Sequence, residues 1–268
     1  MKEIKAIVIG AAGKMGSRII HLIHETPSIS LYRAVERPDH PSIGKDIGEV
    51  IGLGKMGIPL EGDLKKTGGD VIINFTNPKT SLESLEFAKE TGSAIVIGTT
   101  GLSPEQMEKV RDLSKGVRCV FTPNMSVGMN VMFRIVQEVA RVLGPEYDIE
   151  IFEAHHRLKK DSPSGTAVKL GELIAKAVGR EFGKVGVYGR KGMVGERTKE
   201  EIGMQVIRAG DIVGEHTVLF GGIGERLEII HRAHSRDNFA RGAIRAALWV
   251  VNQPNGLYDM QDVLGLKG

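Results

Sequence analysis

The first sixteen residues constrain the fold more than any other part of the chain. A short apolar run, Ile4 to Ile9, leads directly into Gly10-Ala11-Ala12-Gly13-Lys14-Met15-Gly16, and a helix is predicted from about Lys14 to His24. In such a strand, turn and helix, the first glycine permits a tight turn, the second permits close approach of a pyrophosphate, and the third lets the helix pack against the strand. The helix N-terminus offers unpaired N–H groups and a positive dipole end. The sequence therefore predicts a βα unit with a phosphate-binding turn.

An acidic residue further along points to a dinucleotide. A second strand is predicted at Ile29 to Val35, and Glu36 follows it, 20 residues after Gly16, where an acid would bind the adenosine ribose hydroxyls. Arg37 comes next, and its guanidinium would suit the 2′-phosphate of NADP. We predict that this region binds NADH or NADPH, with the preference left open. The alternative is a doubly wound domain without a nucleotide.

The same alternation of strands and helices continues to Phe121. Further strands are predicted at 71–74, 94–97 and 117–121, with helices at about 80–90 and 104–113. The strands are continuous Val- and Ile-rich runs, as expected for a parallel sheet covered by helices on both faces.

Polar and glycine residues follow two of these strands. Phe75 and Thr76 come after the strand ending at Asn74, and Gly98-Thr99-Thr100-Gly101 follows the strand ending at Ile97. Both segments would lie at the carboxyl edge of the sheet, where they would border the nicotinamide half of the cofactor. Each could equally be a turn or a helix N-cap.

After Pro123 the pattern changes. A helix at about 127–143 precedes strands at 149–154, 204–208, 216–220 and 227–231, interrupted by a helix at 166–178, and a last helix at 238–251 is expected to return to the first domain. We therefore predict an α/β protein. A Rossmann-type doubly wound parallel sheet is formed by residues 1–126 and 236–268, and a smaller α+β domain with a mixed sheet by residues 127–235. The polar, glycine-bearing stretch 182–203 is either a mobile lid or a solvated connection.

A basic cluster marks the second domain. His155, His156, Arg157, Lys159 and Lys160 lie within six residues at the end of a predicted strand. On a chain with a net charge of only +3, this cluster indicates a small polyanionic ligand rather than a nucleic acid or a membrane surface. No metal site is predicted, because no third ligand has a suitable spacing.

The cluster is followed by Ser164-Gly165-Thr166, which opens a predicted helix. Hydroxyls and free N–H groups at the positive end of a helix dipole can hold a carboxylate. The simpler interpretation is an N-cap. Beside the basic cluster we favour a carboxylate-binding turn.

Cysteine content and hydropathy indicate the compartment. The single cysteine, Cys119, excludes an intramolecular disulfide, the N-terminus shows no apolar signal region before Gly10, and no apolar run reaches the length needed to span a bilayer. We expect a cytoplasmic protein.

The segment His155-His156-Arg157-x-Lys159-x-Asp161-x-Pro163-Ser164-Gly165-Thr166-Ala167 resembles the signature of the dihydrodipicolinate reductase family. The resemblance extends to the glycine turn, Glu36-Arg37, 98–101, Pro123-Asn124-x-Ser126-x-Gly128, Gly214-Glu215-His216-Thr217 and Ser235-Arg236. It implies hydride transfer from a reduced nicotinamide to a cyclic unsaturated pyridine dicarboxylate, in lysine and diaminopimelate biosynthesis. The chain departs from some relatives in carrying Lys14 in place of arginine, and 182–203 contains no motif of the family.

The resemblance also implies roles for individual residues. His155 would donate the proton, Lys159 would bind or help protonate the substrate, and its carboxylates would be held by His156, Ser164, Gly165 and Thr166. The cofactor site would also include Pro123, Asn124 and Met125, and the second domain's sheet would build a homotetramer. A proton donor and a fixed cation suit the anion that develops on hydride addition.

Two other functions stay open. A semialdehyde or homoserine dehydrogenase relative would share the architecture, although Cys119, within an apolar run, is predicted to be buried and inert rather than a nucleophile. A nucleotide-sensing protein without catalysis would have no need of His155 and Lys159.

Overall fold

The computed structural model describes residues 3–64 and 67–267, which fall into two compact units. Unit 1 contains the described residues up to Val127 together with those from Arg236 onward, and unit 2 runs from Gly128 to Ser235. No helix in the described part of the chain is long and apolar enough to cross a membrane.

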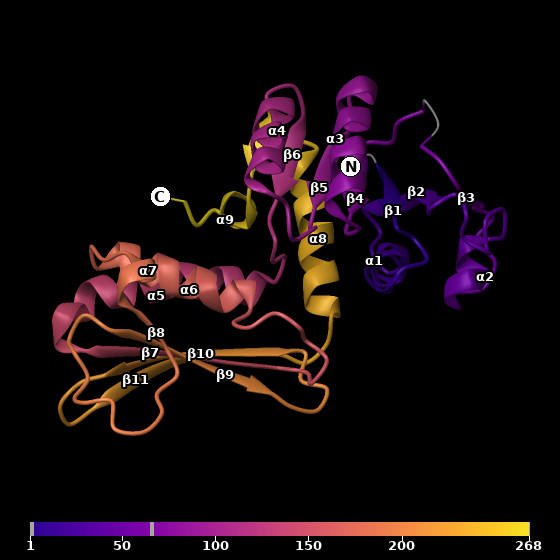
Figure 1. The fold of residues 1–268 in the computed structure, drawn as a ribbon. Helices are drawn as coiled ribbons and strands as arrows, with labels where there is room; N and C mark the ends of the chain where they lie inside the picture. Colours follow the sequence, from indigo (N-terminus) through magenta and orange to yellow (C-terminus); the bar gives the residue numbers. More distant parts are fainter. Residues whose placement is uncertain (1–2, 65–66, 268) are drawn as a thin grey trace. The chain divides into compact units, whose positions relative to one another are not determined.

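Unit 1 is built on a seven-stranded sheet in which all neighbouring strands are parallel (Figure 1). The strand order is β12-β6-β5-β4-β1-β2-β3. The order reverses between β1 and β4, which is the topological switch point of a doubly wound fold. The strands are β1 (Ile4–Ile9), β2 (Ile29–Val35), β3 (Leu60–Glu61), β4 (Val71–Asn74), β5 (Ala94–Ile97), β6 (Arg118–Phe121) and β12 (Gly256–Tyr258).

Helices cover both faces of this sheet. On β1, Ala6 and Val8 belong to the core shared with helices α1 and α8, whereas Ile7 and Ile9 belong to the core shared with α3 and α4. The predicted Rossmann-type fold is thereby confirmed. The helices of unit 1 are α1 (Lys14–His24), α2 (Ile47–Ile51), α3 (Pro78–Thr91), α4 (Pro104–Ser114), α8 (Asp237–Val250) and α9 (Met260–Val263).

The return of the last long helix to unit 1 is also confirmed. Helix α8 contributes Ala240, Ala243, Ala247 and Val250 to the core that contains β1 and α1. The short elements α2, β3, α9 and β12 were not predicted, because segments of two to five residues are too short to show a period.

Unit 2 contains a five-stranded mixed sheet in the order β11-β10-β7-β9-β8. Strand β7 pairs antiparallel with β10 and parallel with β9, which confirms the predicted mixed sheet. Helices α5, α6 and α7 all lie on one side of it (Figure 1). The elements are α5 (Val127–Leu143), η1 (Gly144–Glu146), β7 (Asp148–His155), α6 (Gly165–Ala177), α7 (Phe182–Val185), β8 (Gly186–Tyr188), β9 (Ile202–Arg208), β10 (Gly214–Gly221) and β11 (Arg226–Ala233).

The two faces of this sheet differ in burial. Along β7, Ile149 and Ile151 are buried under the helices, while Glu150 and Phe152 point to the opposite face. We call that opposite side the open face. Apolar side chains lie on it: Phe152 is 37% exposed and Ile230 is 44% exposed, in the same row across β7, β10 and β11.

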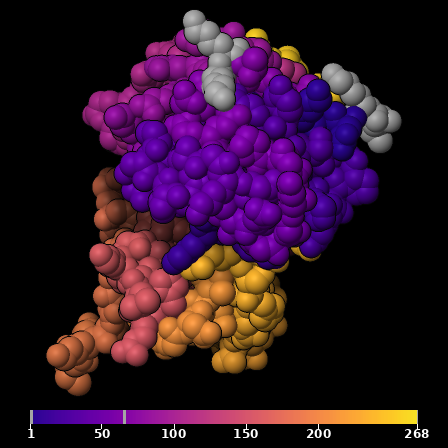
Figure 2. Space-filling model, turned by 90° about the vertical axis from the view of Figure 1, so that its right-hand side faces the viewer, coloured from indigo at the N-terminus to yellow at the C-terminus, as the bar shows by residue number. Residues whose placement is uncertain are grey.

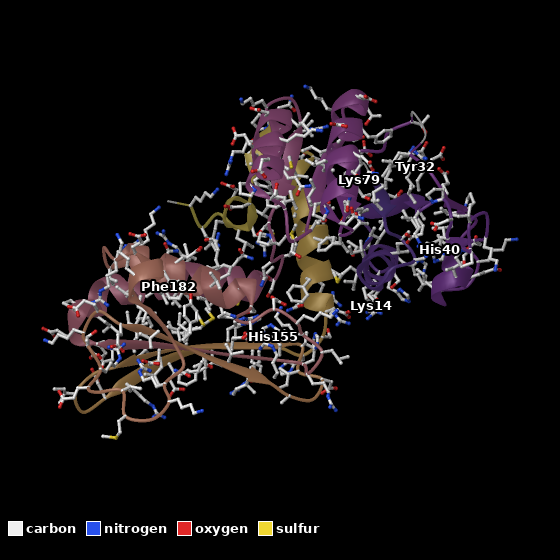
Figure 3. All side chains as sticks on the ribbon, viewed as in Figure 1. Lys14, Tyr32, His40, Lys79, His155 and Phe182 are labelled. Atoms are coloured by element: carbon white, nitrogen blue, oxygen red, sulfur yellow. The ribbon has the colours of Figure 1, made fainter. Side chains whose placement is uncertain are left out.

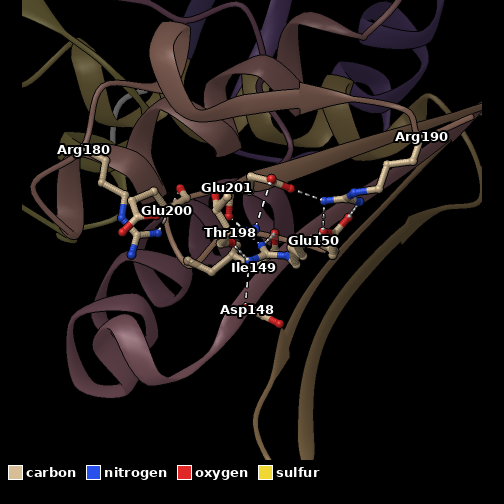
Figure 4. Close-up of polar contacts among 9 residues, drawn as sticks. Asp148, Ile149, Glu150, Arg180, Arg190, Thr198, Glu200 and Glu201 are labelled. Carbon is tan, nitrogen blue, oxygen red and sulfur yellow. Dashed lines mark hydrogen bonds and ion pairs between the residues drawn. The ribbon is translucent and has the colours of Figure 1, made fainter. Parts of the chain in front are cut away.

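The segment 182–203 is more ordered than a simple loop. Its first part forms α7 and β8, and the part after β8 projects from unit 2 (Figure 2). Arg190 and Arg197 both form ion pairs with Glu150, so two arginines attach this projecting loop to the open face (Figure 4). Its position is thus fixed by charge pairs rather than by apolar packing.

Candidate active site

The glycine turn of unit 1 brings three polypeptide segments into close contact. Gly10 has φ +72°, and a Cβ there would lie 2.7 Å from the Thr76 side chain. A Cβ on Gly16 would lie 2.0 Å from the carbonyl oxygen of Gly10. The turn therefore requires glycine both for its backbone conformation and for the packing of α1.

Glu36 lies against this turn, at the end of β2. Its carboxylate accepts hydrogen bonds from the Ala12 N–H at 3.3 Å and from the Arg37 N–H at 3.1 Å. Arg37 itself is exposed and pairs with Asp39 at 3.5 Å. An acid and a cation therefore stand side by side at the mouth of the turn.

The ends of neighbouring strands are joined along the carboxyl edge of the sheet. The Gly10 N–H donates to Val35 O at 2.8 Å, the Gly98 N–H to Asn74 O at 3.0 Å, and the Thr122 N–H to Ile97 O at 3.1 Å. These bonds bring the turn, the 75–76 segment, the 98–101 segment and the 123–125 segment to one edge.

Individual side chains at this edge differ in exposure. The Phe75 ring packs on Gly98, where a Cβ would lie 2.1 Å from the ring, and Thr99 is buried and accepts a hydrogen bond from Ser81. Thr100 and Pro123 are exposed, while Met125 is buried. Phe75, Thr100 and Pro123 are therefore more accessible to a ligand than the Thr99 and Met125 side chains.

These residues fit a dinucleotide. The N-cap of helix α1 is Gly13, which makes no side-chain cap, and Lys14 is exposed at the first turn of the helix (Figure 3). An uncapped helix N-terminus with a lysine and a glycine turn suits a pyrophosphate, and the Glu36 carboxylate suits ribose hydroxyls.

In unit 2 the buried carboxylate of Glu153 organises the basic cluster. Its side chain is fully buried and accepts hydrogen bonds from His155 Nδ1 at 2.5 Å, from the Ser164 N–H at 2.9 Å, and from both terminal nitrogens of Arg208 at 2.8 and 2.9 Å. Burial alone would raise the pKa of Glu153, but these hydrogen bonds outweigh it and lower the pKa to about 2. Glu153 is therefore an anion at neutral pH.

His155 stands at the end of β7, and its ring contacts Glu153 and His216 (Figure 3). An ionised carboxylate can only accept, so Nδ1 carries a proton that it donates to Glu153. The ring of His216 meets it edge-on with centroids 5.2 Å apart. A Cβ on Gly214 would lie 3.0 Å from His155 Nε2, so the glycine leaves the space beside that nitrogen open.

The Ser164-Gly165-Thr166 turn begins helix α6. Ser164 is its N-cap, accepting from the Ala167 N–H at 3.2 Å, and its hydroxyl also contacts His216 Nε2 at 3.2 Å. Ser164 is 2% exposed, whereas Gly165 is exposed. The structure therefore confirms the N-cap interpretation for Ser164 and leaves Gly165 as the accessible residue at this helix end.

Lys159 and the other basic residues lie on the loop between β7 and α6. Lys159 Nζ binds both carboxylate oxygens of Asp161, at 2.9 and 2.8 Å. Arg157 and Lys160 are exposed, and His156 is partly exposed. The Arg208 guanidinium that holds Glu153 also donates to the Asp161 carbonyl at 2.7 Å, which ties this loop to the buried carboxylate.

Two further titratable groups are buried. Desolvation lowers the pKa of His216 to about 3, so this imidazole is neutral, and burial raises the pKa of the Cys119 thiol to about 12. Cys119 lies in the core of unit 1, as predicted, and is not placed as a nucleophile. Within residues 3–64 and 67–267, no group of three or more His, Cys, Asp or Glu side chains could hold a metal ion.

Four residues around His155 were not predicted as part of the site: Glu153, Arg208, Gly214 and His216. The alternation along β7 contains a signal for the first, because Glu153 shares a face with Ile149 and Ile151, and a charged residue on a buried face must be paired. Its ion-pair partner Arg208 comes from β9, while His216 and Gly214, which lie beside the His155 ring, come from β10, and the sequence does not show which strands neighbour β7.

Comparison with known proteins decides the family. The N-terminal model of dihydrodipicolinate reductase matches residues 4–125, and the C-terminal model of the same enzyme matches residues 128–264. The chain belongs to the dihydrodipicolinate reductase family. The C-terminal family model includes α8, although this helix packs in unit 1.

Relatives in this family match over nearly the full length. A 4-hydroxy-tetrahydrodipicolinate reductase of Syntrophus aciditrophicus is 59% identical, covering 98% of this chain and 99% of that protein. Another, of Geotalea uraniireducens, is 55% identical, covering 98% and 100%. The predicted family, the reductase activity and the nicotinamide cofactor are confirmed, and the dehydrogenase alternatives are excluded.

Solved structures agree on the fold. Dipicolinate-bound dihydrodipicolinate reductase from Paenisporosarcina sp. TG-14 matches with a TM-score of 0.75 at 24% identity, covering 97% of this chain and 98% of that one. Aspartate semialdehyde dehydrogenase II from Vibrio cholerae matches with a TM-score of 0.54 at 9% identity, covering 94% and 99%. The architecture is therefore shared more widely than the reductase family itself.

Proposed function

We propose that this chain reduces 4-hydroxy-tetrahydrodipicolinate, or its dehydrated form dihydrodipicolinate, to tetrahydrodipicolinate in lysine and diaminopimelate biosynthesis. NADH or NADPH is the reductant. The observation that carries the proposal is the arrangement in unit 2, where the His155 ring is fixed by a buried carboxylate that also binds the first turn of α6. A proton donor is thus coupled to an anion-binding turn, as reduction of an unsaturated dicarboxylate requires.

The cofactor is held by unit 1. The turn from Gly10 to Gly16 binds the pyrophosphate, Glu36 binds the ribose, and Arg37 accommodates the extra phosphate of NADPH. Phe75, Thr76, 98–100 and 123–125 border the nicotinamide half. A reduced nicotinamide bound there supplies the hydride.

The substrate carboxylates are held in unit 2. The start of α6, with exposed Gly165 and half-buried Thr166, binds one carboxylate with backbone N–H groups and the helix dipole. His156 assists from the basic loop. Both polar groups of Ser164 are engaged within unit 2, so we narrow its role from direct contact to holding this turn in place.

The proton comes from His155. Its Nδ1 donates to Glu153, so the second proton of the imidazolium form is carried on Nε2, beside Gly214. Nε2 gives this proton to the substrate, and the ring is left neutral with its remaining proton on Nδ1. Lys159 places a positive charge near the developing anion, and the Asp161 carboxylate orients its ammonium group until substrate binds.

We also propose a homotetramer assembled through the open face of the unit 2 sheet, and a cytoplasmic location. The exposed Phe152 and Ile230 on that face support the assembly, since paired apolar side chains on a sheet surface favour burial against another copy. A buried free thiol at Cys119 suits a reducing compartment.

The test is nicotinamide oxidation by the purified protein while pyruvate and aspartate semialdehyde are condensed by the upstream synthase, run separately with NADH and NADPH. Oxidation that depends on the synthase is expected, and the two rates rank the cofactors. Tight NADH binding without turnover would instead support a nucleotide sensor.

Two substitutions test the assigned roles in this assay. His155→Ala should lower turnover about 100-fold or more, the usual contribution of a general acid, while NADH binding is retained. Lys159→Ala should lower turnover and raise the KM for the substrate. Equal losses of turnover and NADH binding in His155→Ala would indicate structural damage, and an unchanged rate in Lys159→Ala would remove Lys159 from the site.

A further inference from the structure

The surroundings of Glu153 are unusual for a charged residue on a strand. The Glu153 side chain is fully buried in unit 2, and it accepts hydrogen bonds from His155, from the Ser164 N–H of the α6 turn and from Arg208 at the end of β9. A purely structural ion pair would be satisfied by Arg208 alone, which reaches both carboxylate oxygens. The additional bonds to His155 and Ser164 therefore need an explanation.

We propose that Glu153 is a positioning residue for the reduction: it fixes the tautomer and orientation of His155 and holds the carboxylate-binding turn in register with it. The proposal rests on the function proposed above. Glu153 accepts a hydrogen bond from the protonated Nδ1 of His155. This bond leaves Nε2 as the nitrogen that exchanges a proton with the substrate.

The opposite oxygen of Glu153 sets the position of the turn. Oε1 accepts a hydrogen bond from the N–H of Ser164, the residue immediately before Gly165. One rigid carboxylate therefore binds both the proton donor and the start of α6. A carboxylate is about 2.2 Å between its oxygens, and this short bridge leaves little freedom between the two groups it joins.

Arg208 keeps the carboxylate ionised and still. Its two terminal nitrogens bind one oxygen each, and one of them also donates to the Asp161 carbonyl in the loop that carries Lys159. Bidentate pairing of this kind fixes the carboxylate plane. Glu153 and Arg208 thus connect three parts of the candidate site: the proton donor His155, the Ser164 turn and the loop that carries Lys159.

Glu153→Gln is the direct test, because it removes the charge and changes the shape little. We expect kcat to fall by about 100-fold or more, towards the roughly 10⁴-fold loss seen when a catalytic histidine loses the carboxylate that orients it. The KM for NADH should stay within twofold, because the cofactor is held by unit 1. Glu153→Asp, which keeps a charge against Arg208 but shortens the reach to His155, should also lower kcat. An unchanged kcat in both variants would overturn the proposal.

The matched control is Glu150→Gln. Glu150 lies on the same strand and also binds two arginines, Arg190 and Arg197, but it faces the open side of the sheet. Its activity should stay at the level of the unsubstituted protein. A loss as large as that of Glu153→Gln would show that any broken ion pair on β7 disturbs the fold, and would overturn the specific role of Glu153.

A spectroscopic measurement separates this inference from the proposed function. Nitrogen-15 NMR of histidine-labelled protein, with His155 assigned by loss of its signals in His155→Asn, should show the neutral ring protonated on Nδ1, and on Nε2 in Glu153→Gln. A ring protonated on Nε2 before substitution would overturn the proposal even if the reductase is active. The expected tautomer in a protein that does not turn over the substrate would instead overturn the proposed function alone.

Discussion

The space next to His155 Nε2 depends on a residue with no side chain. Gly214, the first residue of β10, faces the ring so closely that a Cβ would lie 3.0 Å from Nε2. No positive φ is needed there, so what the position requires is the absence of a methyl group rather than backbone freedom.

Gly214→Ala should therefore lower kcat about tenfold or more by moving the ring or crowding the substrate, since small displacements of a catalytic group are costly. The KM for NADH should not change. Gly221→Ala is the control, because it lies on the same strand and its Cβ would meet only Leu219 at an ordinary 3.4 Å. Steady-state kinetics of both variants check this, and equal behaviour would contradict a role for the gap.

His216 should make the protein sensitive to mild acid. Its pKa is lowered to about 3 by burial, while in the unfolded chain it is near 6.5, so the unfolded state takes up a proton first as the pH falls. The stability contributed by the neutral ring is present above pH 6.5 and is lost as the pH falls towards 3, costing about 2 kcal/mol by pH 5.

His216→Gln, which cannot titrate, should lose less stability between pH 7 and pH 5. The free energy of unfolding from urea titrations at both pH values measures this. Exposed His24→Gln is the control for loss of an imidazole. If the free energy of unfolding fell equally between pH 7 and pH 5 in all three proteins, protonation of His216 would not cause the loss of stability.

The helix N-termini of unit 1 differ in whether a side chain caps them. Asn77 caps α3, and Ser103 with Gln106 forms a capping box on α4, whereas the N-cap of α1, Gly13, has no side chain to satisfy the first N–H groups. Of these three helices, the one without a side-chain cap is the one that follows the glycine turn.

Gly16→Ala should disturb this element, because its Cβ would lie 2.0 Å from the Gly10 carbonyl, a backbone atom that cannot rotate away. We expect a loss of about 1–3 kcal/mol of stability and weaker NADH binding. Gly13→Ala, with a less severe 3.1 Å approach to the same atom, should be milder. Thermal unfolding and fluorescence titration with NADH rank the two, and the reverse ranking would contradict this account.

Elements were predictable from sequence in proportion to their length and burial. β4 and β5 are entirely buried, so their apolar runs marked both ends correctly, and the long helix α5 was predicted with its observed bounds. In unit 2 the candidate site was predicted only where its residues are close in sequence, from His155 to Thr166. Arg208 reaches Glu153, and His216 reaches the His155 ring, through pairings of β9 and β10 with β7. Strand pairing across 50 or more residues leaves no local pattern.

At the scale of the whole molecule, the proposed tetramer makes the open face of the unit 2 sheet its interface. Phe152→Asp and Ile230→Asp should each reduce the mass measured by light scattering, because a buried charge in the middle of an interface is costly. Val142→Asp is the control: this side chain is 84% exposed but lies on α5, on the helical side of the sheet. A monomer before substitution, or equal masses in all variants, would contradict the proposed tetramer.

The connectivity of the two units sets an order of events during synthesis. Unit 2 lies between two segments of unit 1, and α8, which fills the core beside β1 and α1, follows all of unit 2 along the chain. A ribosome therefore completes unit 2 while the part of the unit 1 core that α8 fills beside α1 is still uncovered. A nascent chain stalled before residue 237 would expose these apolar side chains to chaperones. The glycine turn of unit 1 and the basic cluster of unit 2 would already have been synthesised.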